Sequence, residues 1–256
     1  MNGDGVSVDD AGPRVAIVTG AARGIGAGIV RALRAAGMAV AGGDLAPLDT
    51  WEWFDEDGAP RASRHALDVA DGSSVAGMVA AAHQAHGRVD VLVNNAGVNH
   101  RAAAEDLPSE AWARVLDVNL TGAFLMSQAV FPHLVTGDDP VIVNIASTHG
   151  LTAFRDTLAY SVSKAGVVQL TRGLALEWGR RGIRVNAVGP TLVATQLTAT
   201  FRADEAQVQQ LLDDVPLGRI ATVADVAAAV VWLCSAKAGM VNGHTLLVDG
   251  GLTAGR

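Results

Sequence analysis

Residues 15–26 read VAIVTGAARGIG, in which an apolar run leads into a glycine-rich turn and then into a helical pattern. Consecutive apolar residues before a turn are typical of a fully buried strand, so we expect a strand–turn–helix unit here. Glycines permit a tight turn, and the free N–H groups and dipole at a helix N-terminus favour an anion such as a pyrophosphate. The stretch lacks the Gly-Lys-Ser/Thr ending of a P-loop, which disfavours a nucleoside triphosphate. A turn that only packs the helix on the strand is the alternative interpretation.

Short apolar runs alternate with longer helical patterns along the rest of the chain. Strands are expected at 15–18, 38–43, 64–67, 89–93, 141–145, 183–188 and 245–248. Helices are expected at 24–36, 73–86, from Ser109, at 119–133, 158–180, 203–213 and 223–235, and Trp51, Trp53 and Phe54 are taken to start a short helix. This alternation predicts an α/β protein: a single-domain, doubly wound Rossmann fold with a mostly parallel seven-stranded sheet and helices on both faces. We expect a flexible leader at 1–12 and one domain at 13–256.

The composition excludes several classes of protein. Of the 256 residues, 50% are hydrophobic and 18% are charged, a balance that supports a large core rather than a disordered chain. A formal charge of −7, without a block of Lys and Arg, argues against nucleic-acid and anionic-membrane partners. No apolar stretch approaches the ~20 residues that a bilayer requires, so we expect no membrane span.

Cysteine and histidine offer neither a disulfide nor a metal site. Cys234 is the only cysteine and lies in an apolar run, so we expect a buried, inert thiol. His83 and His86 share a helix face, but the sequence offers no other ligand nearby, and a solvated face is the preferred interpretation. The first ten residues are acidic and glycine-rich, unlike a signal peptide, so we expect a cytoplasmic protein.

Asp44 ends the second predicted strand, 20 residues after Gly24. A carboxylate at that place can accept hydrogen bonds from the adenosine ribose hydroxyls and would repel a 2′-phosphate, which favours NAD over NADP. Arg23, inside the glycine-rich turn, could instead pair with a 2′-phosphate, and a solvated strand-end acid is the plain alternative for Asp44.

Tyr160 is the only tyrosine of the chain, and Lys164 is one of its two lysines. The two stand at i and i+4 on the predicted helix 158–180, so their side chains point the same way. A phenol has an ordinary pKa near 10, and an ammonium group one turn away favours the phenolate. Tyr160 could then take a proton from an alcohol or give one to a carbonyl, while Ser147, just after a strand, polarises the substrate oxygen.

In their order and spacing these motifs resemble those of the short-chain dehydrogenase/reductase family, and the resemblance covers almost everything after the leader. Each matching piece is weak alone, but the set is highly specific. The pieces are Thr19 to Gly26, Asp44, Asp68-Val69, Asn94-Asn95-Ala96-Gly97, Asn119, Ser147, Tyr160, Lys164, Asn186 and Val248-Asp249-Gly250-Gly251.

The resemblance implies a role for each matching residue. Tyr160 would be the general acid/base, and Ser147 would orient the substrate oxygen. Lys164 would lower the Tyr160 pKa and hold the nicotinamide ribose, and Asn119 would hold a water in a proton relay. The implied contacts to the cofactor, NAD rather than NADP, are Gly20, Arg23, Gly24, Ile25, Gly26, Asp44, Asp68, Val69, Asn95, Ala96, Gly97, Tyr160, Lys164, Pro190, Val193 and Thr195.

One position departs from the family pattern. The family usually shows Pro-Gly after the sixth strand, where this chain has Pro190-Thr191. Thr191 carries a Cβ and cannot freely adopt φ > 0, so we expect the nicotinamide wall around Val193 and Thr195 to be shaped differently.

Substrate recognition is expected at a mobile flap over 191–215 and at His149 and Phe154. The resemblance implies a homotetramer, with the helices around 119–133 and 158–180 between subunits. It implies interconversion of a secondary alcohol and a ketone with NAD(H), the substrate being a polyol, a sugar or another small hydroxy compound. A 3-oxoacyl-thioester or steroid reductase is the alternative within the family. A non-catalytic NAD(H) sensor, and an epimerase or dehydratase, are the alternatives from other classes.

Overall fold

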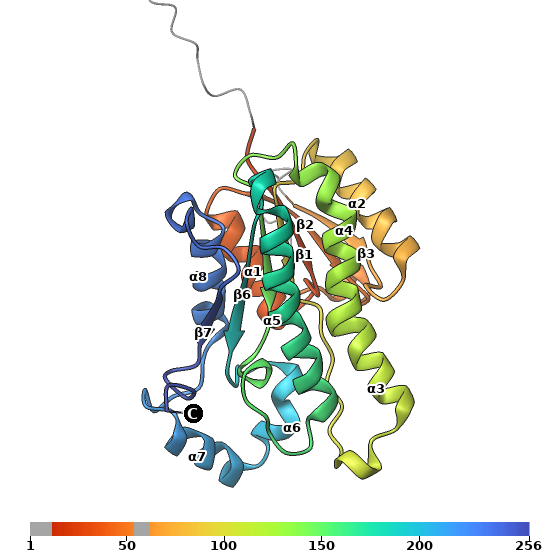
Figure 1. The fold of residues 1–256 in the computed structure, drawn as a ribbon. Coiled ribbons are helices and arrows are strands. Elements are labelled where there is room, and N and C mark those ends of the chain that lie inside the picture. The colour runs from red at the N-terminus through yellow and green to blue at the C-terminus, as the bar shows by residue number, and fades with distance from the viewer. Residues whose placement is uncertain (1–11, 54–61, 256) are drawn as a thin grey trace, which may run out of the picture.

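Seven parallel strands form one sheet in the part of the chain that the computed structural model describes, residues 12–53 and 62–255. The order across the sheet is β3-β2-β1-β4-β5-β6-β7 (Figure 1). The strands are β1 (Val15–Thr19), β2 (Ala39–Asp44), β3 (Ala62–Ala66), β4 (Val91–Asn94), β5 (Val141–Ile145), β6 (Arg184–Pro190) and β7 (Thr245–Val248). The predicted leader, apart from Gly12, and Phe54 lie outside the described residues.

Helices cover both faces of the sheet, which confirms the predicted doubly wound fold (Figure 1). They are α1 (Gly24–Ala35), α2 (Gly72–His86), α3 (Ser109–Leu116), α4 (Gly122–Leu134), α5 (Leu158–Trp178), α6 (Ala199–Arg202), α7 (Glu205–Asp214) and α8 (Val223–Leu233). Side chains alternate along each strand, so Val18 packs in the core beneath α1 and α8, whereas Ile17 packs in the core beneath α2, α4 and α5. None of the helices in the described ranges is long and apolar enough to cross a bilayer.

The order of the strands creates a crevice at one edge of the sheet. β1 pairs with β2 on one side and with β4 on the other, and the connecting helices α1 and α2 lie on opposite faces. The chain therefore leaves the centre of the sheet in two directions. In open parallel sheets, ligands bind in the crevice at the carboxyl ends of the strands where the order reverses in this way.

Two of the predicted helices are one continuous helical segment. α3 runs into α4 through a π-helical turn (Asp117–Thr121) that contains Asn119. A π-helical turn widens the helix by one residue and re-aims the side chains that it carries. The boundary predicted at 119 is therefore wrong, because the helix changes its pitch there and does not end.

Trp51 and Trp53 do not start a helix. They follow a short 3₁₀ turn (Leu48–Thr50), and both indoles are buried. The Nε1 atom of Trp51 donates to the Ala46 carbonyl at 3.1 Å, and that of Trp53 donates to the Ala21 carbonyl at 2.7 Å. Packing against the sheet, rather than local helical preference, sets the conformation of this segment.

The predicted helix at 203–213 begins two residues later than expected. α6 ends at Arg202, and α7 begins at Glu205 after Asp204, whose carboxylate accepts from the Gln207 N–H at 3.1 Å. This N-cap satisfies a helix N–H that lacks an intrahelical partner, and it separates the two helices.

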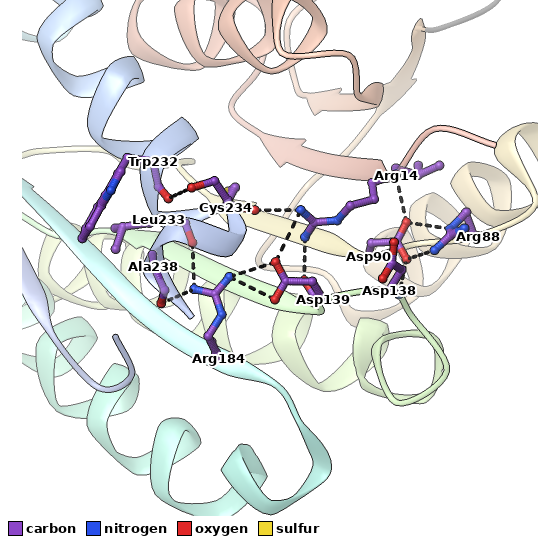
Figure 2. Close-up of polar contacts among 12 residues, drawn as sticks. Arg14, Arg88, Asp90, Asp138, Asp139, Arg184, Trp232, Leu233, Cys234 and Ala238 are labelled. Carbon is purple, nitrogen blue, oxygen red and sulfur yellow. Dashed lines mark hydrogen bonds and ion pairs between the residues drawn. The ribbon is translucent and has the colours of Figure 1, made fainter. Parts of the chain in front are cut away.

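A charged cluster ties strands together at their amino ends, opposite the crevice. Figure 2 shows the Asp139 carboxylate between the guanidinium groups of Arg14 and Arg184, at 3.7 Å and 3.3 Å. Arg14 also donates to the Cys234 carbonyl at 2.7 Å. Burial raises the pKa of the Cys234 thiol to about 12, so the thiol is inert, as predicted.

Candidate active site

A cavity of about 810 Å³ lies in the crevice at the carboxyl ends of the strands. One end is the glycine-rich turn after β1, and the other is the start of α5 with Ser147. Its wall includes every residue that the resemblance assigns to the cofactor. Asn119, His149 and Phe154 do not line it and lie behind its wall or beside it. The volume is within the range of small-molecule and cofactor sites.

The glycines of the turn are required by close packing. Gly20 has φ +62°, and a Cβ there would lie 2.9 Å from the Ala96 Cα. A Cβ on Gly26 would lie 2.0 Å from the Gly20 carbonyl oxygen. Asn95 holds the turn in place, because its Nδ2 donates to the carbonyls of Thr19 and Gly20, both at 3.0 Å.

The N-terminus of α1 suits a pyrophosphate. The N-cap residue, Arg23, makes no capping hydrogen bond with its side chain. Within the described residues, the N–H groups of Ile25 and Gly26 have no hydrogen-bond partner. Both residues line the cavity. Unpartnered N–H donors at a helix N-terminus, beside a turn whose close packing leaves room only for glycine, suit the pyrophosphate of a dinucleotide.

Two carboxylates lie at this end of the cavity. Asp44 accepts from the Ala22 N–H and from the Ala46 N–H, both at 2.9 Å. Each carboxylate oxygen can accept a second hydrogen bond, so Asp44 can still receive a ribose hydroxyl. The second carboxylate, Glu52, accepts from the Gly24 N–H at 3.0 Å and is not among the residues that the sequence predicts for the site. The alternation Trp51-Glu52-Trp53 is the available signal, since an extended segment with two buried tryptophans exposes the residue between them.

Ser147, Tyr160 and Lys164 meet at the other end. Ser147 follows β5 by two residues, and Tyr160 and Lys164 lie one turn apart near the start of α5. The Lys164 Nζ lies 5.6 Å from the centroid of the Tyr160 ring and donates to the Ile145 carbonyl at 2.6 Å. The arrangement brings a hydroxyl, a phenol and an amine to one wall of the cavity.

Burial controls the ionisation of this pair. It raises the pKa of Tyr160 to about 12, against a smaller opposing effect of a hydrogen bond with Ser147. It also lowers the pKa of Lys164 to about 8. The net shift of the Tyr160 pKa is upward, because loss of hydration favours the neutral form of both groups, and the lowering of this pKa by Lys164 stays a prediction. Tyr160 is therefore a phenol here and can act as a proton donor without further change.

Asn119 is directed by the π-helical turn toward the loop after β4. Its Oδ1 accepts from the Val98 N–H at 2.8 Å, and its Nδ2 donates to the Val98 carbonyl and to the Ser163 hydroxyl, both at 2.9 Å. These three bonds join the π-helical turn, α5 and the loop that forms part of the cavity wall. The geometry supports a positioning role for Asn119, and the water relay stays a prediction.

His149 and Phe154 lie beside the catalytic groups. Their rings stack at 4.2 Å, and the His149 ring meets the Tyr160 ring edge-on at 5.4 Å. The His149 Nδ1 is 3.3 Å from the Ser147 hydroxyl. Burial, and secondarily the charge of Arg101, lowers the His149 pKa to about 4, so the imidazole is neutral at pH 7.

Thr191 does not adopt the positive φ that a glycine would permit, and a different shape of the wall around Val193 and Thr195 stays a prediction. The Thr191 N–H donates to the Val248 carbonyl at 3.3 Å. The backbone here continues the pairing of β6 with β7, so a glycine is not needed. Across the described ranges, no cluster of three or more metal-ligating side chains is present.

Comparison with known proteins relates the whole chain to dehydrogenases and reductases. Residues 20–253 match the family model described as enoyl-(acyl carrier protein) reductase. The chain is 41% identical over 242 residues to a D-threitol dehydrogenase of Mycolicibacterium smegmatis, covering 94% of this chain and 93% of that protein.

Two solved structures share the fold. A gluconate 5-dehydrogenase from Burkholderia cenocepacia, in complex with NADP and tartrate, has a TM-score of 0.90 at 33% identity, with 96% of this chain and 97% of that chain covered. A 3-ketoacyl-(acyl-carrier-protein) reductase from Brucella melitensis, complexed with NADH, has a TM-score of 0.83 at 33% identity, with 94% and 99% covered.

Proposed function

Since the chain belongs to the short-chain dehydrogenase/reductase family, we propose that it interconverts a small secondary alcohol and its ketone with NAD(H). One observation carries this proposal. Ser147, Tyr160 and Lys164 converge at one end of a cavity whose other end is a glycine-rich helix N-terminus. A cavity that offers donors to a pyrophosphate at one end and proton-transfer groups at the other suits a dinucleotide-dependent redox reaction.

The residues of this chain supply the proton transfer and the orientation. Ser147 donates a hydrogen bond to the oxygen of the substrate, which places that oxygen beside the Tyr160 phenol. In reduction, the phenol donates its proton to the developing alkoxide; in oxidation, the phenolate takes the proton of the alcohol. Lys164, when charged, stabilises the phenolate, and its hydrogen bond to Ile145 holds it under the ring. The nicotinamide, when bound, supplies or accepts the hydride.

Asp44 supports a preference for NAD. It stands at the end of β2, where a carboxylate in this fold receives the adenosine ribose hydroxyls, and a like charge there disfavours a 2′-phosphate. The two relatives with solved structures bind NADP and NADH respectively, so the family accommodates both cofactors. Parallel assays with NAD and NADP test the preference.

We propose a polyol or a sugar-derived alcohol as the substrate class. The D-threitol dehydrogenase and the gluconate 5-dehydrogenase are named for such compounds, and both resemble this chain over nearly their full lengths. Hydroxyl, imidazole and guanidinium groups gather near the catalytic end (Ser147, His149 and Arg101), which suits a polar substrate.

A homotetramer is the assembly that we propose. Among the described residues, α4 and α5 expose large apolar side chains, which include Phe124, Val162 and Leu176, the last 84% exposed. Exposed apolar side chains on two helices are typical of a subunit interface. Light scattering of the protein, and of a Leu176→Glu variant, tests this assembly.

NADH formation over a panel of polyols and sugars tests the function. We expect turnover by the wild type and a loss of at least about 10²-fold in the Tyr160→Phe variant, because only the proton-transfer group is removed. Binding of NAD, followed by the protein's tryptophan fluorescence, is expected to change far less than turnover in the variant, because Tyr160 is only one of many residues that line the cofactor cavity. Unchanged turnover would refute the role of Tyr160, and tight NAD binding without turnover on any alcohol would favour a sensor.

A further inference from the structure

Two buried tryptophans fix the segment that carries Glu52. Trp51 and Trp53 are 1% and 4% exposed, and their rings meet edge-on at 5.4 Å. They pack over Gly42 of β2, where a Cβ would lie 2.6 Å from the Trp53 ring. The two anchors flank a single exposed residue, so the position of Glu52 is set by the core rather than by a free loop.

Glu52 is attached to the glycine-rich turn through both its backbone and its side chain. Its N–H donates to the Ala22 carbonyl at 2.7 Å, and its carbonyl accepts from the Arg31 Nη1 at 3.0 Å. Its carboxylate accepts from the Gly24 N–H at 3.0 Å and faces the cavity. An acidic group at this place is also favoured by the dipole of α1.

The carboxylates of Glu52 and Asp44 flank Arg23. Asp44 accepts from the N–H of Ala22, and Glu52 accepts from the N–H of Gly24, so the two acids approach the backbone on either side of one residue. Arg23 lines the same cavity, and its guanidinium has no hydrogen bond or ion pair within the described residues. Arg23 therefore stands, along the chain, between the two N–H groups from which the acids accept.

We propose that Glu52 is a second specificity-determining carboxylate, which acts with Asp44 to exclude dinucleotides that carry a 2′-phosphate. The proposal rests on the proposed dehydrogenase function, because it concerns the same cavity. A 2′-phosphate adds close to two negative charges beside the ribose hydroxyl that Asp44 receives. Glu52 adds a second acidic group at this end of the cavity, which opposes the binding of a 2′-phosphate. Without it, one acid fewer opposes the phosphate, and the cations of the same wall, Arg23 and Arg31, are better able to receive it.

The Glu52→Gln variant isolates the charge. Glutamine has the same length, and its side-chain oxygen can still accept from the Gly24 N–H, so the fold of the turn is preserved. Asp49→Asn is the matched control: it removes one charge from an exposed acid three residues earlier, in the same segment, that does not line the cavity. Dissociation constants of NADP and NAD, from tryptophan fluorescence, are compared for the wild type and both variants, together with kcat/KM on a shared alcohol.

We expect Glu52→Gln to bind NADP roughly fivefold to tenfold more tightly than the wild type, with NAD affinity changed by less than about twofold. Asp49→Asn is expected to change neither. An unchanged NADP affinity in Glu52→Gln, or an equal gain in Asp49→Asn, would overturn the proposal. Absence of turnover on every alcohol overturns the proposed function alone, because the binding comparison still measures Glu52. A wild type that binds neither dinucleotide overturns both.

Discussion

The Nζ atom of Lys164 lies 5.6 Å from the centroid of the Tyr160 ring, yet it donates its short hydrogen bond to the carbonyl of Ile145. Lys164 is 4% exposed, and its amine shares its low-dielectric surroundings with the phenol. Burial therefore raises the pKa of Tyr160 to about 12 and lowers that of Lys164 to about 8, so that each group favours its neutral form. Any further charge at the site therefore acts on a neutral phenol beside an amine whose pKa is about 8.

Lys164→Met tests the electrostatic role of this amine. Formation of the phenolate is opposed by burial, and the ammonium is the cation of this chain that favours it, so its loss raises the Tyr160 pKa further. We expect the acidic limb of the pH profile for alcohol oxidation to move to higher pH, with kcat/KM at pH 7 falling about tenfold for every pH unit that the limb moves. Lys237→Met, which changes an exposed lysine away from the cavity, is the control. A lower rate without movement of the limb would contradict the electrostatic role.

His149→Gln tests the neutral imidazole beside Ser147. Its pKa is lowered from 6.5 to about 4 by burial, with a contribution from Arg101. Between these values the unfolded chain binds more protons than the folded protein, so stability rises as the pH increases from about 4 to 6.5. We expect the wild type to lose more thermal stability than the variant between about pH 7.5 and pH 5. His100→Gln, at an exposed histidine, should retain the wild-type loss; an equal loss in all three proteins would refute the lowered pKa of His149.

Local patterns account for what the sequence could predict. The apolar runs that become strands, the glycine-rich turn, and the i, i+4 spacing of Tyr160 and Lys164 depend on neighbours in the chain, and the structure has each of them. The π-helical turn around Asn119 depends on bonds to Val98 and Ser163, which lie 21 and 44 residues away. The amino-acid sequence of the turn itself does not indicate those partners.

Glu52 and the split between α6 and α7 show two different reasons for a missed feature. Glu52 reaches the cavity because Trp51 and Trp53 pack on a distant strand, a tertiary effect that composition and periodicity do not contain. Asp204, in contrast, is an acidic N-cap followed by Glu205, a local helix-start signal that the sequence does contain. The place of Glu52 in the cavity could be found only from the three-dimensional structure, whereas the N-cap at Asp204 could be predicted from the sequence.

Asp139→Asn tests the charged cluster at the amino ends of the strands. The carboxylate faces Arg14 and Arg184, and its residue has φ +41°, which asparagine tolerates, so the substitution removes charge without adding backbone strain. We expect the free energy of unfolding to fall by about 1–3 kcal/mol, since two partly buried guanidinium groups lose their counter-ion. Turnover should be unchanged, because the catalytic groups lie at the opposite edge of the sheet. Denaturant unfolding measures the effect, and a loss no larger than that of Asp138→Asn would contradict it.

Phe201→Ala tests whether the segment 191–215 acts as a flap. Phe201, on α6, lies beneath the guanidinium of Arg101, whose Cζ is 5.7 Å from the ring centroid, and Arg101 belongs to the loop after β4. This contact joins the two segments that border the catalytic end. Because a cation–π contact at an exposed site contributes about 0.5–1 kcal/mol, we expect Phe201→Ala and Arg101→Gln each to raise the KM of the alcohol about twofold to fivefold.

The same contact gives a double-mutant test. If the pair closes the flap, the combined variant should raise KM by less than the product of the two single effects, while the dissociation constant of NAD stays the same in all three variants. Independent effects that multiply fully would show that Arg101 and Phe201 act separately. A change in NAD affinity of the same size as the change in KM would show that the segment orders the cofactor site instead of covering the substrate.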